Sequence, residues 1–125
     1  MIQTLPLVAL GGALGASARY IVNMAALRLV GPGFPWSTLA VNVLGSLLMG
    51  ALAVALAQRD LVRFAPLLMT GILGGFTTFS AFSLDTITLW QRGEIVAATT
   101  YVAGSVGLSL IALLAGMAIA RGFSA

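Results

Sequence analysis

The stretch that decides the fold is Gly71-Ile-Leu-Gly-Gly-Phe-Thr-Thr-Phe-Ser-Ala-Phe-Ser83. It lies in the middle of an apolar segment, residues 64–90, that is long enough to cross a bilayer as one helix. Two adjacent glycines followed by two β-branched threonines form helix poorly, so we expect a break near Gly74–Thr78. Inside a membrane a break is tolerated only where the freed backbone groups face protein, an ion or a water-filled cavity. The stretch is therefore a candidate functional site.

The composition is that of an integral membrane protein. Hydrophobic residues make up 60% of the chain and charged residues only 7%, whereas a soluble domain carries about 25% charged residues. The six arginines are too dispersed for a nucleic-acid-binding face, which needs clustered basic residues. The chain contains no cysteine or histidine, so disulfides, imidazole bases and the usual soft metal ligands are excluded. We therefore do not expect an enzyme.

Four apolar segments predict four transmembrane helices, at about residues 5–27, 37–57, 64–90 and 94–120. Each is long enough for a bilayer crossing, which takes roughly 20 residues. The connections are short, so residues 1–125 are expected to form a single all-α transmembrane domain. The first segment contains Ala16-Ser17-Ala18, which resembles a signal-peptidase site, but no positive residue precedes it. We interpret this segment as a retained helix.

The arginines are distributed almost evenly between the two sides of this bundle. If both termini and the second loop share one side, that side holds Arg59, Arg63 and Arg121, and the other holds Arg28 and Arg92, with Arg19 if it reaches that far. A bias of positive charge normally fixes the orientation of a membrane protein. Because the bias is nearly absent here, we predict an antiparallel, dual-topology homodimer.

Polar side chains within the apolar segments are candidate site residues. Asn42 offers two N–H donors and one acceptor, although a hydrogen bond between helices would equally explain it. Tyr101, Ser105 and Ser109 recur every four residues and lie on one face over about 12 Å of helix. Serine hydroxyls can also bond back to their own helix. Three in register favour a polar path over simple packing.

Two phenylalanines of the central stretch, Phe79 and Phe82, are i, i+3 neighbours. Packing alone would explain them, but the edge of an aromatic ring is positive and would favour an anion. Moving even a carboxylate-sized ion into low dielectric costs about 20 kcal/mol, so a path needs several donors. Fixed charge would hold the anion too tightly for exit. Arg19 is therefore expected to snorkel to the interface or to lie in a vestibule.

Backbone carbonyls freed near Gly74–Thr78 favour a different ion, because their negative ends can coordinate a cation. In an antiparallel pair the carbonyls of both copies would converge on the axis. A sodium-like ion held in this way would be structural rather than transported.

These motifs together resemble the Fluc (CrcB) family of small fluoride channels, over the whole chain. The resemblance rests on the segments 11–20, 38–45 and, above all, 74–83. It implies a dual-topology homodimer that exports fluoride passively from the cytoplasm through two antiparallel pores, each lined by both subunits. It also implies a multi-pass protein of the plasma membrane, the inner membrane of a bacterium, in contact with lipid.

The resemblance also assigns roles to single residues. It implies a pore lined by Asn42, Phe79, Phe82, Tyr101, Ser105 and Ser109. It implies that Gly74 and Thr77 offer backbone carbonyls to a central structural sodium ion. Asp85 stands where the family often has glutamate, and Leu113 where it often has a further hydroxyl.

Two other functions remain open. A small multidrug antiporter also has four helices, but it needs a proton-titrating carboxylate deep in the membrane, and Asp85 lies toward the end of the third segment. A non-transporting assembly subunit would use the same polar residues only to hold helices together.

Overall fold

The computed structural model is an all-helical bundle that describes residues 2–124, with side chains as far as residue 122. Helix α1 (Leu5–Leu29) follows a 3₁₀ turn, η1 (Ile2–Thr4), and the second and fourth crossings are α2 (Trp36–Gln58) and α5 (Ile95–Ser124). Four consecutive elements make up the third crossing: the 3₁₀ turn η2 (Val62–Phe64), the π-helix η3 (Pro66–Leu73), α3 (Gly74–Phe76) and α4 (Phe79–Gln91). All four crossings are long and apolar enough to span a membrane, which confirms the predicted fold class.

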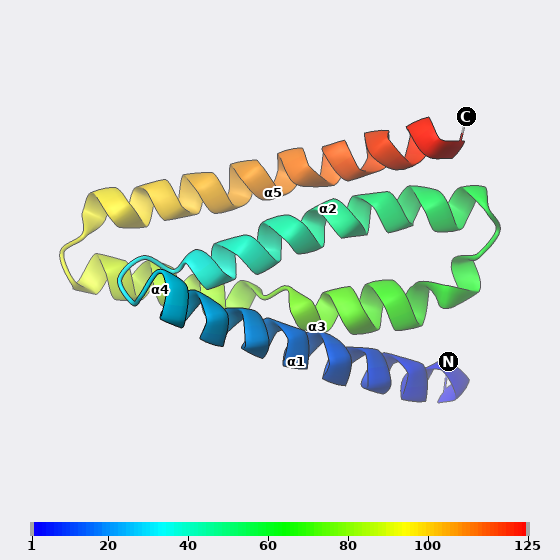
Figure 1. Ribbon diagram of the computed structural model, residues 1–125, viewed down its shortest axis with the longest axis horizontal. Helices are drawn as coiled ribbons and strands as arrows, with labels where there is room; N and C mark the ends of the chain where they lie inside the picture. The colour runs from blue at the N-terminus through cyan, green and yellow to red at the C-terminus, as the bar shows by residue number, and fades with distance from the viewer. Residues whose placement is uncertain (1, 125) are drawn as a thin grey trace.

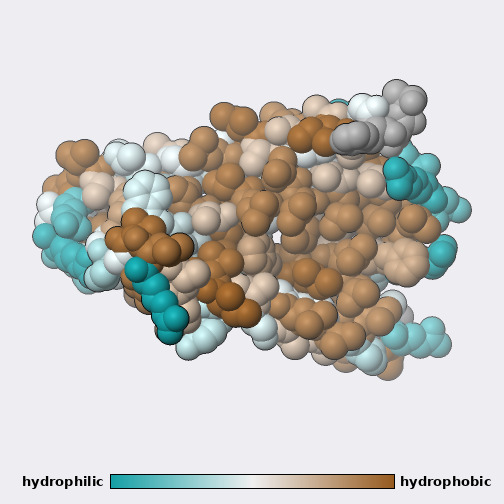
Figure 2. All heavy atoms as spheres, viewed as in Figure 1, coloured by the Kyte–Doolittle hydropathy of each residue, from teal (hydrophilic) through white to brown (hydrophobic). Residues whose placement is uncertain are grey.

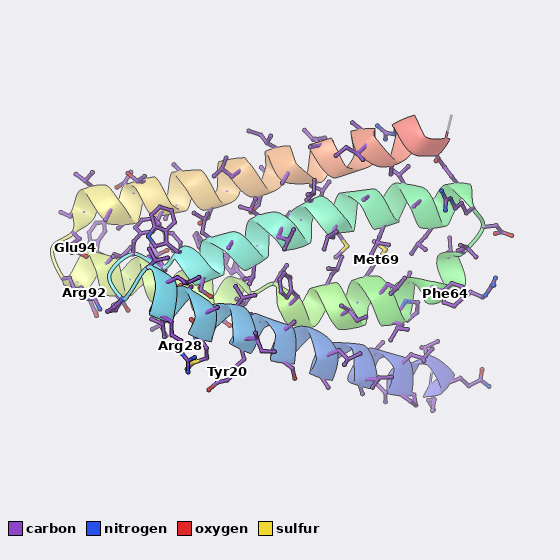
Figure 3. The ribbon with its side chains drawn as sticks, in the orientation of Figure 1. Tyr20, Arg28, Phe64, Met69, Arg92 and Glu94 are labelled. Carbon is purple, nitrogen blue, oxygen red and sulfur yellow. The ribbon has the colours of Figure 1, made fainter. Side chains whose placement is uncertain are left out.

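The crossings lie side by side along one direction (Figure 1). Both ends of the chain lie at the same end of the bundle as the turn between α2 and η2, and the other two connections lie at the opposite end. Arg92 and Glu94 occupy that opposite end, with Arg28 nearby, while Phe64 lies toward the end with the chain termini (Figure 3). The assumption behind the count of arginines on each side is thus confirmed.

Glycines make two of the tight connections possible. Gly31 and Gly33, between α1 and α2, have φ values of +79° and +131°, which side chains with a Cβ rarely adopt. Gly93 (φ +81°) ends α4 in a Schellman motif: its N–H donates to the Trp90 carbonyl, and the Glu94 N–H donates to the Leu89 carbonyl. The chain therefore reverses direction within a few residues.

Other glycines bring helices into backbone contact. A Cβ on Gly15 of α1 would overlap the Ile72 carbonyl oxygen of η3, and one on Gly75 would meet the Gly12 carbonyl oxygen at 2.7 Å. Likewise, α2 and α5 touch where a Cβ on Gly116 would overlap the Leu47 carbonyl oxygen. Lipid supplies little hydrophobic driving force between helices, so such close van der Waals approach is the main source of attraction.

The face of the bundle drawn in Figure 2 is apolar along its middle and hydrophilic at its two ends. Large apolar side chains such as Leu110, Ile111 and Leu114 of α5 are 62–65% exposed. In water such a surface would aggregate, whereas lipid tails or a second protein subunit can cover it. This distribution agrees with a protein that spans the bilayer.

The predicted break in the third crossing is confirmed, and it is narrower than expected. Thr77 (φ −88°, ψ 159°) and Thr78 (φ −154°, ψ 127°) are extended, and α4 begins at the next residue. Gly74 keeps helical dihedral angles, and Gly75 serves the close contact with α1. The threonines therefore form the break, and the glycines before it allow tight packing. The π-helical winding of η3 was not expected from the sequence.

Candidate functional site

A cavity of about 310 Å³ lies beside the break, between α2, α4 and α5. Five of the six predicted pore residues line it; only Tyr101 does not. The remaining lining residues are small, hydroxyl-bearing or apolar, and none is charged: Gly45, Ser46, Met49, Thr77, Thr78, Val106 and Leu113. The predicted residues thus meet at one site, although they come from three segments far apart in the sequence.

Asn42 of α2 is bonded to the break through both ends of its amide. Its Nδ2 donates to the Thr78 carbonyl at 2.9 Å, and its Oδ1 accepts from the Thr78 N–H at 2.8 Å. Each extended residue of a broken helix has backbone groups that need partners inside a membrane, and Asn42 supplies both for Thr78. One Nδ2 hydrogen remains, because the amide has two N–H donors.

Thr78 in turn holds the first turn of α4. It is the N-cap residue, and its Oγ1 accepts from the Ala81 N–H at 3.1 Å. On the other side of the break, Thr77 closes the end of α3: its N–H and its Oγ1 both donate to the Leu73 carbonyl, at 3.0 and 2.9 Å. The two threonines therefore terminate one helical segment and start the next.

These bonds divert donors from two backbone carbonyls. In an unbroken α-helix, the Thr78 N–H would donate to the Gly74 carbonyl and the Ala81 N–H to the Thr77 carbonyl. Here the first donates to Asn42 and the second to the Thr78 side chain. The carbonyls whose helical donors these two bonds divert are those of Gly74 and Thr77, the pair that the family resemblance implies as ligands of a cation. Carbonyl oxygens suit such an ion chemically.

Arg19 of α1 binds the same region. Its Nε donates to the Gly75 carbonyl at 3.1 Å, which in an unbroken helix would accept from Phe79. The guanidinium is therefore turned onto the broken helix and is not simply extended to the membrane surface as snorkelling would require. A positive group at this position also complements the negative end of the helical segment that stops at Phe76.

The two phenylalanines lie together at the mouth of the cavity. The Phe79 and Phe82 ring centroids are 5.5 Å apart, with the ring planes tilted at 52° to each other. Phe82 also contacts Tyr101, at 5.2 Å between centroids. Phe79 is 74% exposed, so within one chain the cavity has an open side.

Tyr101 lies behind the cavity and is almost completely buried. Its hydroxyl donates to Asp85 Oδ2 at 3.0 Å, and the hydroxyls of Thr38 and Ser105 are among its neighbours. Asp85 and Thr38 line a second cavity, of about 210 Å³, at the end of the bundle that carries Arg92. Tyr101 therefore contacts a lining residue of each cavity, Phe82 of the first and Asp85 of the second.

Ser105 of α5 lines the first cavity and is also a neighbour of the Tyr101 hydroxyl. Its Oγ is buried and has no hydrogen-bond partner among the described residues, while it lines the cavity together with Ser109. A buried hydroxyl without a partner costs about 1–3 kcal/mol. Such a cost is retained most readily where a ligand or water supplies the bond.

One residue and one hydrogen bond of the site were not predicted from the sequence. Thr78 was not singled out, although a threonine directly before the helical run that begins at Phe79 is a common N-cap signal. The Asp85–Tyr101 bond joins residues 16 positions apart, on opposite sides of a turn, and no local pattern identifies it.

The chain matches the family model described as CrcB-like protein, Camphor Resistance (CrcB), over residues 6–117. It is 62% identical over 125 residues, all of both chains, to a protein of Cereibacter sphaeroides named fluoride-specific ion channel FluC. Proteins of that name from Paracoccus denitrificans (62% over 118 residues, 94% of each chain) and Rhizobium etli (56% over 123 residues, 97% of this chain and 98% of the other) are also similar.

Proposed function

Because this chain belongs to the CrcB-like family, we propose that it is a fluoride-specific ion channel whose ion crosses passively through the cavity between α2, α4 and α5. One observation carries this proposal most directly. The cavity gathers an amide, three serine hydroxyls and two aromatic rings, with no charged side chain among its lining residues. Neutral donors can replace the water around a small anion without binding it too tightly for exit.

Individual donors fit this role. The second Nδ2 hydrogen of Asn42 and the unbonded Ser105 hydroxyl are the free donors of the path. The Phe79 and Phe82 rings contribute positive edges, and Ser109 extends the path by one helical turn beyond Ser105. Fluoride is the strongest hydrogen-bond acceptor among the halides, so hydroxyl and amide donors favour it.

The working unit is proposed to be an antiparallel homodimer with two pores. The open side of the cavity at Phe79 supports this arrangement, because a second chain can close it. The nearly equal numbers of arginines at the two ends also support it, since neither orientation is strongly favoured. A two-fold axis in the membrane plane would relate the two chains.

A structural sodium ion is proposed at the axis of that dimer. The Gly74 and Thr77 carbonyls fit such an ion because their helical donors are diverted to side chains. The ion would supply fixed positive charge that holds carbonyls of both chains together. We propose the plasma membrane, the inner membrane of a bacterium, as the location, and outward flux as the physiological direction: hydrogen fluoride enters uncharged and releases its proton in a neutral cytoplasm.

Purified protein in liposomes loaded with fluoride tests the proposal. We expect rapid fluoride efflux, recorded with a fluoride electrode, and no comparable efflux from liposomes loaded with chloride. Proton-coupled transport of an organic cation would instead identify an antiporter, and liposomes as tight as protein-free ones would indicate an assembly subunit. Either result would overturn the channel.

A further inference from the structure

The side chain of Asn42 binds the backbone of Thr78, 36 residues away in the sequence and the second of the two extended residues in the third crossing. No other described side chain makes two hydrogen bonds to the backbone of the break. Asn42 lines the cavity, and both of these bonds join its side chain to the backbone of the break. The Asn42 amide therefore bears on the proposed cation site as well as on the proposed anion path.

We propose that Asn42 is a positioning residue for the cation site: by holding the Thr78 N–H, it keeps the Gly74 carbonyl free to bind the ion. This inference rests on the proposed sodium site and deepens it. Without Asn42, the nearest acceptor that helical geometry offers to the Thr78 N–H is the Gly74 carbonyl, and closing that bond would turn the carbonyl away from the ion.

A second hydrogen bond, accepted by the Thr78 side chain, keeps the Thr77 carbonyl free in the same way. The Thr78 Oγ1 holds the Ala81 N–H, whose helical partner would be the Thr77 carbonyl. The extended backbone of Thr78, which Asn42 stabilises, is what brings this Oγ1 into the N-cap position. The two carbonyls are thus kept free by a chain of bonds that begins at Asn42, while the remaining Asn42 hydrogen serves the anion path.

Asn42→Leu removes both bonds while it keeps the number and branching of the side-chain heavy atoms, and Asn42→Asp keeps an acceptor for the Thr78 N–H. We expect N42L to bind sodium at least tenfold more weakly than the unaltered chain, and N42D to bind it within about threefold. The measurement is isothermal titration calorimetry with sodium chloride on detergent-purified dimer in N-methyl-D-glucamine buffer. Asn23→Leu is the matched control, since Asn23 is the other asparagine and has no bond to the break; its sodium affinity should not change.

A second pair of variants tests the same mechanism if N42L fails to fold. Thr78→Val removes the Oγ1 acceptor at equal volume, whereas Thr78→Ser keeps it. Sodium affinity should fall at least tenfold in T78V and be restored in T78S. Fluoride efflux gives an independent readout: N42D should lose efflux while it keeps sodium affinity, because the carboxylate retains the acceptor but not the amide donor of the path.

The outcomes separate this inference from the proposed function. If folded N42L or T78V binds sodium as tightly as the unaltered chain, the positioning role is wrong while the sodium site and the channel stand. If the unaltered chain itself binds no sodium but conducts fluoride, the cation site and this inference are both wrong and the channel remains.

Discussion

At Ser105, the side chain that favours fluoride transport is expected to lower the stability of the fold. Its hydroxyl is buried without a partner among the described residues, so removing it relieves a desolvation cost rather than breaking a bond. We expect Ser105→Ala to unfold with unchanged free energy or to gain up to about 1 kcal/mol. Fluoride efflux should slow about tenfold, the effect of losing one donor worth about 1.4 kcal/mol.

Thermal unfolding in detergent and liposome efflux measure the two quantities on the same preparation. Ser83→Ala is the control, because the Ser83 hydroxyl donates to the Phe79 carbonyl of its own helix and does not line the cavity. It should transport at the original rate. A less stable S105A protein with full efflux would show that the hydroxyl supports packing and not the ion.

The two aromatic rings of the cavity can be tested by a change that keeps a large apolar side chain but removes the positive ring edge. We expect Phe79→Ile and Phe82→Ile each to abolish measurable fluoride efflux from liposomes, while the dimer persists by size-exclusion chromatography. Phe64→Ile makes the same change at the end of the bundle, where the Phe64 ring lies 4.7 Å from the Arg63 guanidinium. That control should retain efflux. Full transport in both cavity variants would show that the two rings contribute only to packing.

At the scale of helices, the contact between α2 and α5 depends on Gly116. A Cβ there would overlap the Leu47 carbonyl oxygen, which belongs to rigid backbone and cannot move aside as a flexible side chain could. We expect Gly116→Ala to lower the free energy of unfolding by about 1–3 kcal/mol, the usual cost of overpacking. Gly104→Ala, also on α5, meets nothing within 4 Å in the chain and should cost less than about 0.5 kcal/mol. Thermal unfolding of both proteins decides the comparison, and equal losses would contradict the close helix contact.

The sequence predicts well those elements whose structure depends on residues close together in the chain. Long apolar runs predicted the four crossings, and poor helix propensity around Thr77–Thr78 predicted the break. The π-helix Pro66–Leu73 has no such local signature. It packs closely against α1, where a Cβ on Gly11 would meet the Leu67 carbonyl oxygen at 2.6 Å, and a contact between residues so far apart in the chain is not visible in a local pattern.

The residues of the candidate site also could be predicted only where a local sequence pattern groups them. Spacing along α5 correctly groups Ser105 with Ser109, which both line the cavity. Spacing also groups Tyr101 with them, although the structure puts that side chain behind the cavity, against Asp85. The partner of Asn42 could not be predicted, because the bond joins two crossings and Thr78 presents backbone groups rather than a side chain.

At the scale of the whole molecule, the balance of arginines between the two ends predicts how the chain inserts. We expect Gln3→Arg with Gln58→Arg to direct the ends of the chain to the cytoplasm, and Gln91→Arg with Glu94→Arg to direct them outward, because positive loops stay inside. A reporter fused to the C-terminus measures the orientation, and the unaltered chain should give signal on both sides.

Efflux from membranes of the same cells completes this test. Each double variant expressed alone should lose fluoride transport, since all copies point one way, and co-expression of the two should restore it. Full transport by either double variant alone would contradict the antiparallel dimer, and a one-sided signal from the unaltered chain would contradict dual topology.

Both ends of the chain lie at one end of the bundle (Figure 1), since an even number of crossings returns a polypeptide to the side it left. If the C-terminus of one copy were joined to the N-terminus of a second by a soluble tether, both copies would therefore insert into the membrane in the same orientation, whatever the length of the tether. An opposed pair could be encoded in a single gene only if the tether itself traversed the bilayer. A tandem fusion with such a spanning tether should be functional, and one with a flexible hydrophilic tether should not.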